Sequence, residues 1–286
     1  MDIQNLRAFM MVAEHASFST AAVHLHLTQP AVSKRVASLE QQLGTALFDR
    51  IGRRVSLTEA GTALLPHART IWQDLELAQQ SITDLSGTVS GRLKLATSHH
   101  IGLHRLAPVL RRFSTNYPQV TLDIDFMDSE QAYEEILRVS VELAVVTLAP
   151  EQDANMLAQP IWPDPLAFMA DKNHPLCGRA SVSLQELSEH PVILPALNTY
   201  TGQIARELFD REGLQLNVAM STNYLETIRM MASIGLGWTI LPHSMLDDRL
   251  KTIHVPIEPL QRVLGYIYHR GRSLSNAAQA FIKELY

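Results

Sequence analysis

Three histidines and a serine form the densest group of side chains that could bind an ion or a small molecule. They are Ser98, His99, His100 and His104. Histidine donates and accepts hydrogen bonds, changes charge near neutral pH and binds transition metals. A helix would place His100 and His104 on one face, but the glutamate of an HExxH motif is absent and no cysteine lies nearby. We therefore expect hydrogen bonds to a small molecule here, and no metal ligands.

Further hydroxyl and amide side chains follow other predicted strands, where each strand leads into a helix. Open α/β sheets bind ligands at this edge, and helix N-termini present N–H groups with positive partial charge. The sequence therefore predicts a cleft for a small anion, such as a carboxylate or a hydroxy acid. The expected ligand contacts are Ser98, His99, His100, Thr147, Asn198, Thr199, Thr201 and Thr222.

A basic stretch contrasts with the acidic balance of the whole chain, whose formal net charge is −5. Between positions 28 and 54 the acidic residues are Glu40 and Asp49. The basic residues there are more numerous: Lys34, Arg35, Arg50, Arg53 and Arg54. Such a cluster is also common on a solvated surface, so its meaning depends on the elements that carry it.

Three short helices and a hairpin are predicted for the first 58 residues. Apolar residues recur at helical spacing from Ile3 to His15, and Ser19 or Thr20 is placed to cap a second helix. A third helix begins after Thr28, with Pro30 in its first turn, and ends at Gly44. Two short apolar strands then flank a turn at 52–54. This order predicts a winged helix-turn-helix, an element that binds double-stranded DNA.

A long helix is predicted from Thr58 to Leu85, followed by a hinge at 86–91. Its apolar positions alternate between spacings of four and three residues: Leu64, Ala68, Ile71, Leu75, Ala78, Ile82 and Leu85. An unbroken heptad register is typical of a two-helix coiled coil, which predicts a homodimer. Packing of this helix on its own domain is the alternative.

Strands and helices alternate after Gly91, which indicates an α/β domain with a parallel sheet. Strands are expected at 92–96, 120–126, 143–148, 166–170, 192–194, 216–220, 238–241 and 263–268. Helices are expected at 104–113, 129–139, 203–211, 225–234 and 276–286. We therefore divide the chain into a winged helix-turn-helix (1–58), a linker helix with hinge (59–90) and an effector-binding domain (91–286). That domain should hold two subdomains, about 91–160 with 266–286, and about 161–265, as in periplasmic binding proteins.

The composition fits a cytoplasmic globular protein, with 46% hydrophobic residues. No apolar run reaches the roughly 18 residues that span a bilayer, and the N-terminal residues lack the features of a secretory signal. The single cysteine, Cys177, excludes an internal disulfide and the thiol pair of most redox sensors. We expect no membrane association and no cofactor.

The first 60 residues closely resemble the signature of LysR-type transcriptional regulators. The matching residues are Leu6, Phe9, Ala13, Ser17, Phe18, Ala21, Ala22, Leu25, Gln29, Pro30, Ala31, Val32, Ser33, Leu39, Glu40, Leu43, Gly44, Leu47, Phe48, Arg50, Leu57, Thr58, Ala60 and Gly61. Later matches are Tyr117-Pro118, Gly235-Leu236-Gly237 and Leu241-Pro242. Ser140 and Glu142 depart from the glycine and aspartate common in the family. The segment Thr97–Gly102 resembles regulators of branched-chain amino-acid biosynthesis.

The resemblance implies that the third helix enters the major groove of DNA. Gln29 would then bond adenine, Arg35 would read guanine and Ala31 would touch a thymine methyl group. Ser33 and Lys34 would meet phosphates, and the wing arginines a flanking backbone or minor groove. The full set of expected DNA-binding residues is Thr28, Gln29, Pro30, Ala31, Ser33, Lys34, Arg35, Arg50, Arg53 and Arg54. For Pro30, a purely geometric role is the alternative.

The function implied by the resemblance is that of a transcription activator or repressor. Its partners would be double-stranded DNA, a small-molecule effector, further copies in a homodimer or homotetramer, and RNA polymerase. A metal- or redox-responsive regulator and an α/β enzyme are the alternatives. The enzyme is disfavoured because GxSxG, P-loop and GxGxxG motifs are absent, and Gly235-Leu236-Gly237 precedes a strand rather than a helix.

Overall fold

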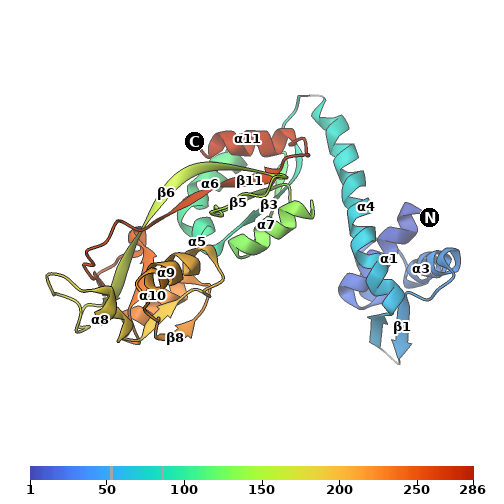
Figure 1. The fold of residues 1–286 in the computed structure, drawn as a ribbon. Coiled ribbons are helices and arrows are strands. Elements are labelled where there is room, and N and C mark those ends of the chain that lie inside the picture. The colour runs from blue at the N-terminus through green and yellow to red at the C-terminus, as the bar shows by residue number, and fades with distance from the viewer. Residues whose placement is uncertain (52–53, 86) are drawn as a thin grey trace. The chain divides into compact units, whose positions relative to one another are not determined.

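The computed structural model describes residues 1–51, 54–85 and 87–286. The chain divides into two compact units, Met1–Ser86 and Gly87–Tyr286 (Figure 1). The elements of the first unit are α1 (Ile3–His15), α2 (Phe18–His24), α3 (Gln29–Leu43), β1 (Phe48–Ile51), β2 (Arg54–Leu57) and α4 (Glu59–Asp84). Strands β1 and β2 pair antiparallel. The predicted helix-turn-helix with its hairpin is confirmed.

Local capping chemistry sets the ends of the first three helices. Thr28 caps α3 by accepting a hydrogen bond from the backbone N–H of Ala31, and Gly44 ends it at φ 70°. Both were expected. The cap of α2 was predicted wrongly: it is Ser17, which accepts from the N–H of Thr20. Since Ala16 already leaves the helical region at φ 47°, the first hydroxyl after it is the one in position to cap.

The core of the first unit lies where α1, α2 and α3 meet, around the fully buried Leu6, Phe9 and Leu39. Glu40 of α3 accepts hydrogen bonds from the backbone N–H groups of Leu47 and Phe48, at 2.8 Å and 3.3 Å. These hydrogen bonds connect the start of the hairpin to α3. The orientation of the hairpin relative to the helix is therefore fixed within this unit.

Helix α4 has two parts with different surroundings. Its first turns pack on the core of the first unit through Leu64 and Ala68. Farther along, Ile71 and Ile82 are exposed, at 37% and 71%, as is Leu85 just beyond the helix at 87%, whereas Leu75 is half-buried. The alternative of packing on its own domain thus holds for the first half of the helix, as far as Trp72, whose ring lies under Arg7 of α1.

The second unit contains a seven-stranded mixed sheet, and a short sheet of β7 with β8. Its strands are β3 (Gly91–Thr97), β4 (Val120–Phe126), β5 (Leu143–Thr147), β6 (Met156–Asp171), β7 (Val192–Leu194), β8 (Val218–Ser221), β9 (Thr239–Pro242), β10 (Leu250–Thr252) and β11 (Gln261–His269). Its helices are α5 (His99–Ile101), η1 (Gly102–Leu106), α6 (Ala107–Asn116), α7 (Ser129–Leu137), α8 (Leu184–Ser188), α9 (Tyr200–Arg211), α10 (Leu225–Ser233), η2 (His243–Met245) and α11 (Asn276–Glu284).

The expectation of a parallel sheet is correct only for part of the second unit. Strand β3 pairs parallel with β4 and β5, whereas β11 pairs antiparallel with β5 and β6. The long strand β6 leads out of the first subdomain and β11 leads back into it, so the two run in opposite directions. Figure 1 shows this pair of strands crossing the second unit, with α6, α7 and α11 around one end and α8, α9 and α10 around the other.

Each end of the second unit has its own apolar core. One surrounds β3 and contains Leu95, Phe113 and Phe281. The other contains Phe209 and Trp238, and the indole N–H of Trp238 donates to the carbonyl of Leu187 at 2.9 Å. Two cores joined by two crossing strands are the expected architecture of two α/β subdomains. Among the described residues, no helix is long and apolar enough to cross a bilayer.

Several helices begin or end where the sequence analysis did not place them. Helical structure starts at His99 rather than at 104, because Ser98 caps it by accepting from the N–H of Ile101. Similarly, α9 starts three residues before its predicted start, because Thr199 caps it. Ser129 does not cap α7; its hydroxyl accepts from the N–H of Thr147 instead. Helix α8 and strand β10, both short, were not predicted.

Candidate functional sites

The exposed side of α3 carries the residues expected to contact DNA. Gln29, Pro30 and Lys34 are exposed, whereas Val32 on the opposite side is fully buried. The amide of Gln29 donates to the hydroxyl of Ser33 at 3.0 Å. Arg35 donates to the side chain of Gln4 at 3.3 Å, which holds its guanidinium beside α1. The helix therefore presents polar donors on a surface that a nucleic-acid groove can reach.

Four further residues expected to contact DNA lie on α3 or at its start. Ala31, Ser33 and Arg35 are half-buried, and the hydroxyl of Thr28 is used in the cap of α3. The wing was expected to contribute three arginines. Arg53 and the side chains of Arg50 and Arg54 lie outside the described residues.

A cleft in the second unit gathers most of the predicted ligand contacts. Its open space measures about 480 Å³ when the solvent at its mouth is included. The lining residues are Ser98, His99, His100, Asp128, Ser129, Glu130, Thr147, Pro195, Thr199, Thr201, Asn223, Leu225 and Arg262. They come from the ends of β3 and β5, the starts of α7, α9 and α10, and from β11. The cleft therefore lies between the subdomains, at the strand ends where the sequence placed it.

Two of the eight expected ligand contacts do not line this cleft. Asn198 is exposed, and its backbone carbonyl accepts from the side chain of Gln203. The hydroxyl of Thr222 accepts from the backbone N–H of Tyr224 at 3.4 Å. The neighbouring Asn223 takes the place of Thr222 in the cleft wall. A tight turn before α10 decides which of two adjacent polar residues faces inward, and sequence alone does not resolve this choice.

Arg262 is the main cleft residue that sequence reasoning missed. It lies on β11 and is only 6% exposed. Its Nε donates to Asp164 at 2.8 Å and its Nη1 donates to the hydroxyl of Thr201 at 2.9 Å. Its Nη2 is buried and has no hydrogen-bond partner among the described residues. Burial lowers the pKa of Arg262, but the Asp164 carboxylate opposes this, and arginine stays protonated.

Acidic side chains also line the cleft and were not predicted. Glu130 accepts from the backbone N–H of Tyr200 at 2.5 Å, at the N-terminus of α9. Burial raises the pKa of Glu130, and the hydrogen bond from Tyr200 opposes this rise. Asp128 accepts from the amide of Asn223 at 2.6 Å. Glu130 thus occupies an N–H group at the positive end of a helix, where an anionic ligand would also be favoured.

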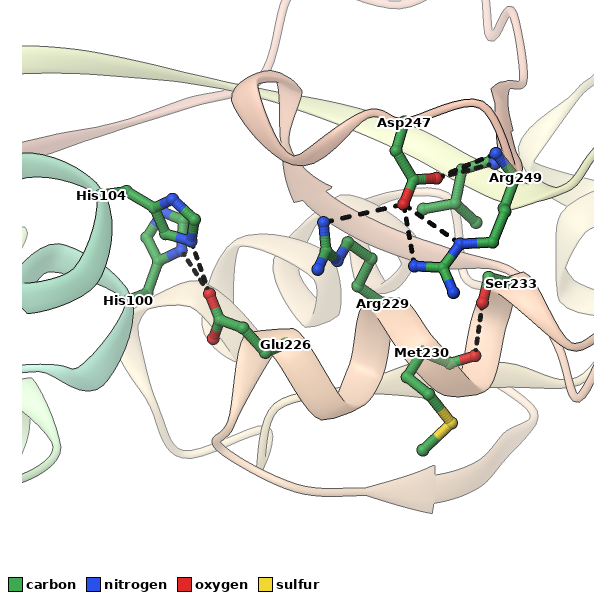
Figure 2. A network of polar contacts seen from close by, with 9 residues as sticks. His100, His104, Glu226, Arg229, Met230, Ser233, Asp247 and Arg249 are labelled. Atoms are coloured by element: carbon green, nitrogen blue, oxygen red, sulfur yellow. Dashed lines mark hydrogen bonds and ion pairs between the residues drawn. The ribbon is translucent and has the colours of Figure 1, made fainter.

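His100 is buried beside the cleft, with 4% exposure, and neither ring nitrogen has a hydrogen-bond partner among the described residues. Burial first, then the charges of Arg262 and His104, lower its pKa to about 4. The ring is therefore neutral at physiological pH. Its Nδ1 lies 3.5 Å from Glu226, and His104 bonds the same carboxylate oxygen at 2.7 Å (Figure 2).

The cleft as a whole combines a buried guanidinium, hydroxyl groups and helix N-termini in a small volume. Charge-assisted hydrogen bonds from a planar guanidinium suit a carboxylate. Arg105 adds a second cation nearby by donating to Asp164 at 3.4 Å. The arrangement can therefore hold a small organic acid between the two subdomains.

Comparison with known families identifies both units. The family described as "Bacterial regulatory helix-turn-helix protein, lysR family" matches residues 3–62. The family described as "LysR substrate binding domain" matches residues 86–286. Together these matches cover almost the whole chain.

Individual relatives agree with the family matches. A RuBisCO operon transcriptional regulator from Allochromatium vinosum is 30% identical over 287 residues, 98% of this chain and 94% of the relative. An HTH-type transcriptional regulator from Azotobacter vinelandii, in an ibpB–leuC intergenic region, is 64% identical over 108 residues, 38% of this chain and 75% of the relative. The crystal structure of full-length CbnR with its target DNA has the same fold, with TM-score 0.74, 20% identity and coverage of 100% of this chain and 99% of that one. The chain therefore belongs to the LysR family of bacterial DNA-binding transcription regulators with a C-terminal effector-binding domain.

Proposed function

We propose that this regulator responds to a small anionic metabolite whose carboxylate is held by Arg262. The observation that supports this most directly is the buried Nη2 of Arg262, which has no partner among the described residues while the rest of the guanidinium is fixed by Asp164 and Thr201. Buried polar atoms are normally paired, so an unpaired donor on a residue that lines the cleft calls for an acceptor. A bound carboxylate would supply it.

The other contacts of the effector follow from the residues around Arg262. Ser98, His99, His100, Thr147, Thr199 and Thr201 line the cleft and complete the proposed set. Asn198 and Thr222 also belong to the sequence-based set. They would reach the effector after a rearrangement of their turns on binding. A carboxylate near the start of α9 would compete with Glu130 for the N–H of Tyr200. Effector binding would then alter a contact between the subdomains.

The test is a thermal-shift and calorimetry screen of the purified chain against small organic acids, hydroxy acids and amino acids. Branched-chain compounds come first because of the resemblance at Thr97–Gly102, and each acid is paired with its uncharged amide. At about one hundred times the dissociation constant, a bound acid should stabilise the fold by about 2.7 kcal/mol. The matched amide should leave the melting temperature unchanged.

Two arginine-to-lysine variants test whether Arg262 binds the carboxylate of the effector. Arg262→Lys keeps the charge but loses the planar fork, and we expect about tenfold weaker binding of the acid, equivalent to about 1.4 kcal/mol. The control is Arg206→Lys, at an exposed position of α9. Thr201→Val removes the neighbouring hydroxyl without touching the ion pair. An effector that binds Arg262→Lys as tightly as the unmodified chain would exclude this role for Arg262.

For the DNA interface we propose that α3 reads the operator through Gln29, Ala31 and Arg35. The remaining proposed contacts are Thr28, Pro30, Ser33, Lys34, Arg50, Arg53 and Arg54. The support is the exposure of Gln29, Pro30 and Lys34 in the first turns of α3, on the side away from the buried Val32. Gln29→Ala and Arg35→Ala should each lose about 1–3 kcal/mol of discrimination between operator and mismatched DNA. Lys283→Ala, at an exposed position of the second unit, is the control.

The assembly we propose is a homodimer through α4, paired again into a homotetramer through the second units. The exposed apolar residues Ile71, Ile82 and Leu85 support the first contact. We also propose that the chain is not an enzyme, because relatives matched over nearly its whole length are named as transcription regulators. A regulator of this kind would work in the cytoplasm, where it meets chromosomal DNA and RNA polymerase.

A further inference from the structure

Two histidines and a glutamate meet at the edge of the effector cleft. One ligand-type atom from each of His100, His104 and Glu226 lies within 4.8 Å of the other two. The oxygen of Glu226 is 2.7 Å from Nε2 of His104 and 3.5 Å from Nδ1 of His100. Figure 2 shows both imidazole rings turned toward this carboxylate. We propose that these three side chains bind a divalent transition-metal ion of the zinc class.

The buried ring of His100, which makes no hydrogen bond within the described residues, is the observation that points to a ligand. This side chain is 4% exposed, and neither of its ring nitrogens has a hydrogen-bond partner among the described residues. An unpaired buried polar atom costs about 1–3 kcal/mol. A cation bound to Nδ1 would satisfy the nitrogen that faces Glu226.

The two separations from Glu226 to the histidines are close to what a metal requires. Zinc binds nitrogen and carboxylate oxygen at about 2.0–2.2 Å, so two ligand atoms of one tetrahedral site lie about 3.3 Å apart. The observed separations of 2.7 Å and 3.5 Å lie on either side of this value. Small rotations of the exposed His104 and half-buried Glu226 side chains would therefore complete the geometry.

The local backbone and charges also favour this site. His100 and His104 are four residues apart along α5 and η1, and η1 is a π-helix, a rare form that often occurs at functional sites. Arg229, one turn after Glu226 on α10, pairs with Asp247 at 3.7 Å and does not occupy the Glu226 carboxylate (Figure 2). His104 and Glu226 are 42% and 30% exposed, which leaves an entry path and room for a water as fourth ligand.

The position of the site gives it a structural consequence. His100 and His104 belong to the subdomain built on β3, and Glu226 belongs to α10 of the other subdomain. A bound cation would therefore join the two subdomains at the mouth of the cleft, next to His100, which lines it. Metal occupancy would hold the cleft in the arrangement seen here.

The experiment uses the full-length chain without a histidine tag, freed of metal with a chelator and titrated with zinc chloride by calorimetry. We expect one strong site per chain. His104→Asn and Glu226→Gln should each weaken zinc binding at least about tenfold, the scale of losing one ligand or its support. The matched controls, His243→Asn and Glu207→Gln, change exposed residues outside the cluster and should bind as the unmodified chain does.

Cobalt(II) gives a second readout that does not depend on stability. Tetrahedral cobalt absorbs strongly in the visible range, so its spectrum should appear in the unmodified chain and in both controls, and should disappear in His104→Asn and Glu226→Gln. Equal zinc affinity in the cluster variants and the controls would overturn the proposal. So would the absence of a stoichiometric site in the unmodified chain. Neither measurement uses effector or DNA, so the outcome is independent of the proposed effector.

Discussion

At the scale of single residues, the ion pair between Arg262 and Asp164 sets the electrostatics of the cleft. Both side chains are almost completely buried, at 6% and 1% exposure. Asp164 accepts from Arg262 and from Arg105, and Arg262 also reaches Thr201. Burial of charge is costly unless each group is paired, so Asp164 compensates the charge of the Arg262 guanidinium. Removal of either partner should lower the stability of the whole second unit.

Asp164→Asn tests this compensation. The substitution keeps the size of the side chain but leaves the buried guanidinium without its countercharge, which should lower the free energy of unfolding by about 3–5 kcal/mol. Urea unfolding followed by circular dichroism measures the change. Asp210→Asn, at an exposed position of α9, should alter stability by less than about 0.5 kcal/mol. A similarly small effect for Asp164→Asn would mean that the pair contributes no net compensation.

At the scale of elements, α4 has one end in a core and a long apolar stripe beyond it. Ala68 is fully buried in the first unit, whereas Ile82 and Leu85 are exposed. Arg7 lies over the ring of Trp72 at 4.9 Å, which adds a contact between α1 and the middle of the helix. An exposed stripe at heptad spacing is unfavourable in water and is stabilised by a second helix.

A double substitution tests this use of α4. Ile71→Glu with Leu75→Glu would place like charges in the predicted seam, so we expect at least about tenfold weaker dimerisation. Sedimentation velocity across a concentration series measures it. Arg69→Glu with Thr70→Glu changes two exposed residues outside the seam and should leave assembly intact. If the seam variant sediments as the unmodified chain does, dimerisation must use another surface.

At the scale of the whole molecule, the chain combines a DNA-binding unit with a ligand-binding unit of two subdomains. Polar contacts join these subdomains in the present arrangement: Glu130 with Tyr200, Asp128 with Asn223, and His104 with Glu226. A ligand acts on such a protein only by binding one arrangement more tightly than another. Any effect of the effector on DNA binding must therefore be matched by an equal effect of DNA on effector binding.

This reciprocity gives a prediction for the effector found in the screen. If the effector changes operator affinity by a given factor, operator DNA should change effector affinity by the same factor, typically about 5–150-fold. Fluorescence anisotropy of labelled operator and calorimetry of the DNA complex measure the two sides. Gln29→Ala should weaken operator binding without changing effector affinity in the absence of DNA. Unequal factors in the two directions would show that the measured states are not linked at equilibrium.

Local chemistry in the sequence determined much of this protein. Helical spacing and caps placed α1 and α3, and hydroxyl residues after strands placed Ser98, Thr147 and Thr199 in the cleft wall. These features depend on interactions within a few residues, so they are visible in a linear pattern. The main local errors were in the choice of capping residue: Ser17 caps α2 in place of Ser19 or Thr20, and the hydroxyl of Ser129 bonds the backbone of Thr147 instead of capping α7.

Only the tertiary structure decided which distant side chains meet. Arg262 lies inside a strand and faces Asp164 from 98 positions away, and His104 meets Glu226 across 122 positions. No periodic pattern marks such residues, because their partners are chosen by strand pairing and by the packing of one subdomain against the other. The same folding brings Glu226 to the two histidines and supplies the acidic ligand that the local sequence lacks. The sequence thus located the cleft, while the fold supplied its central charge and the cluster at its edge.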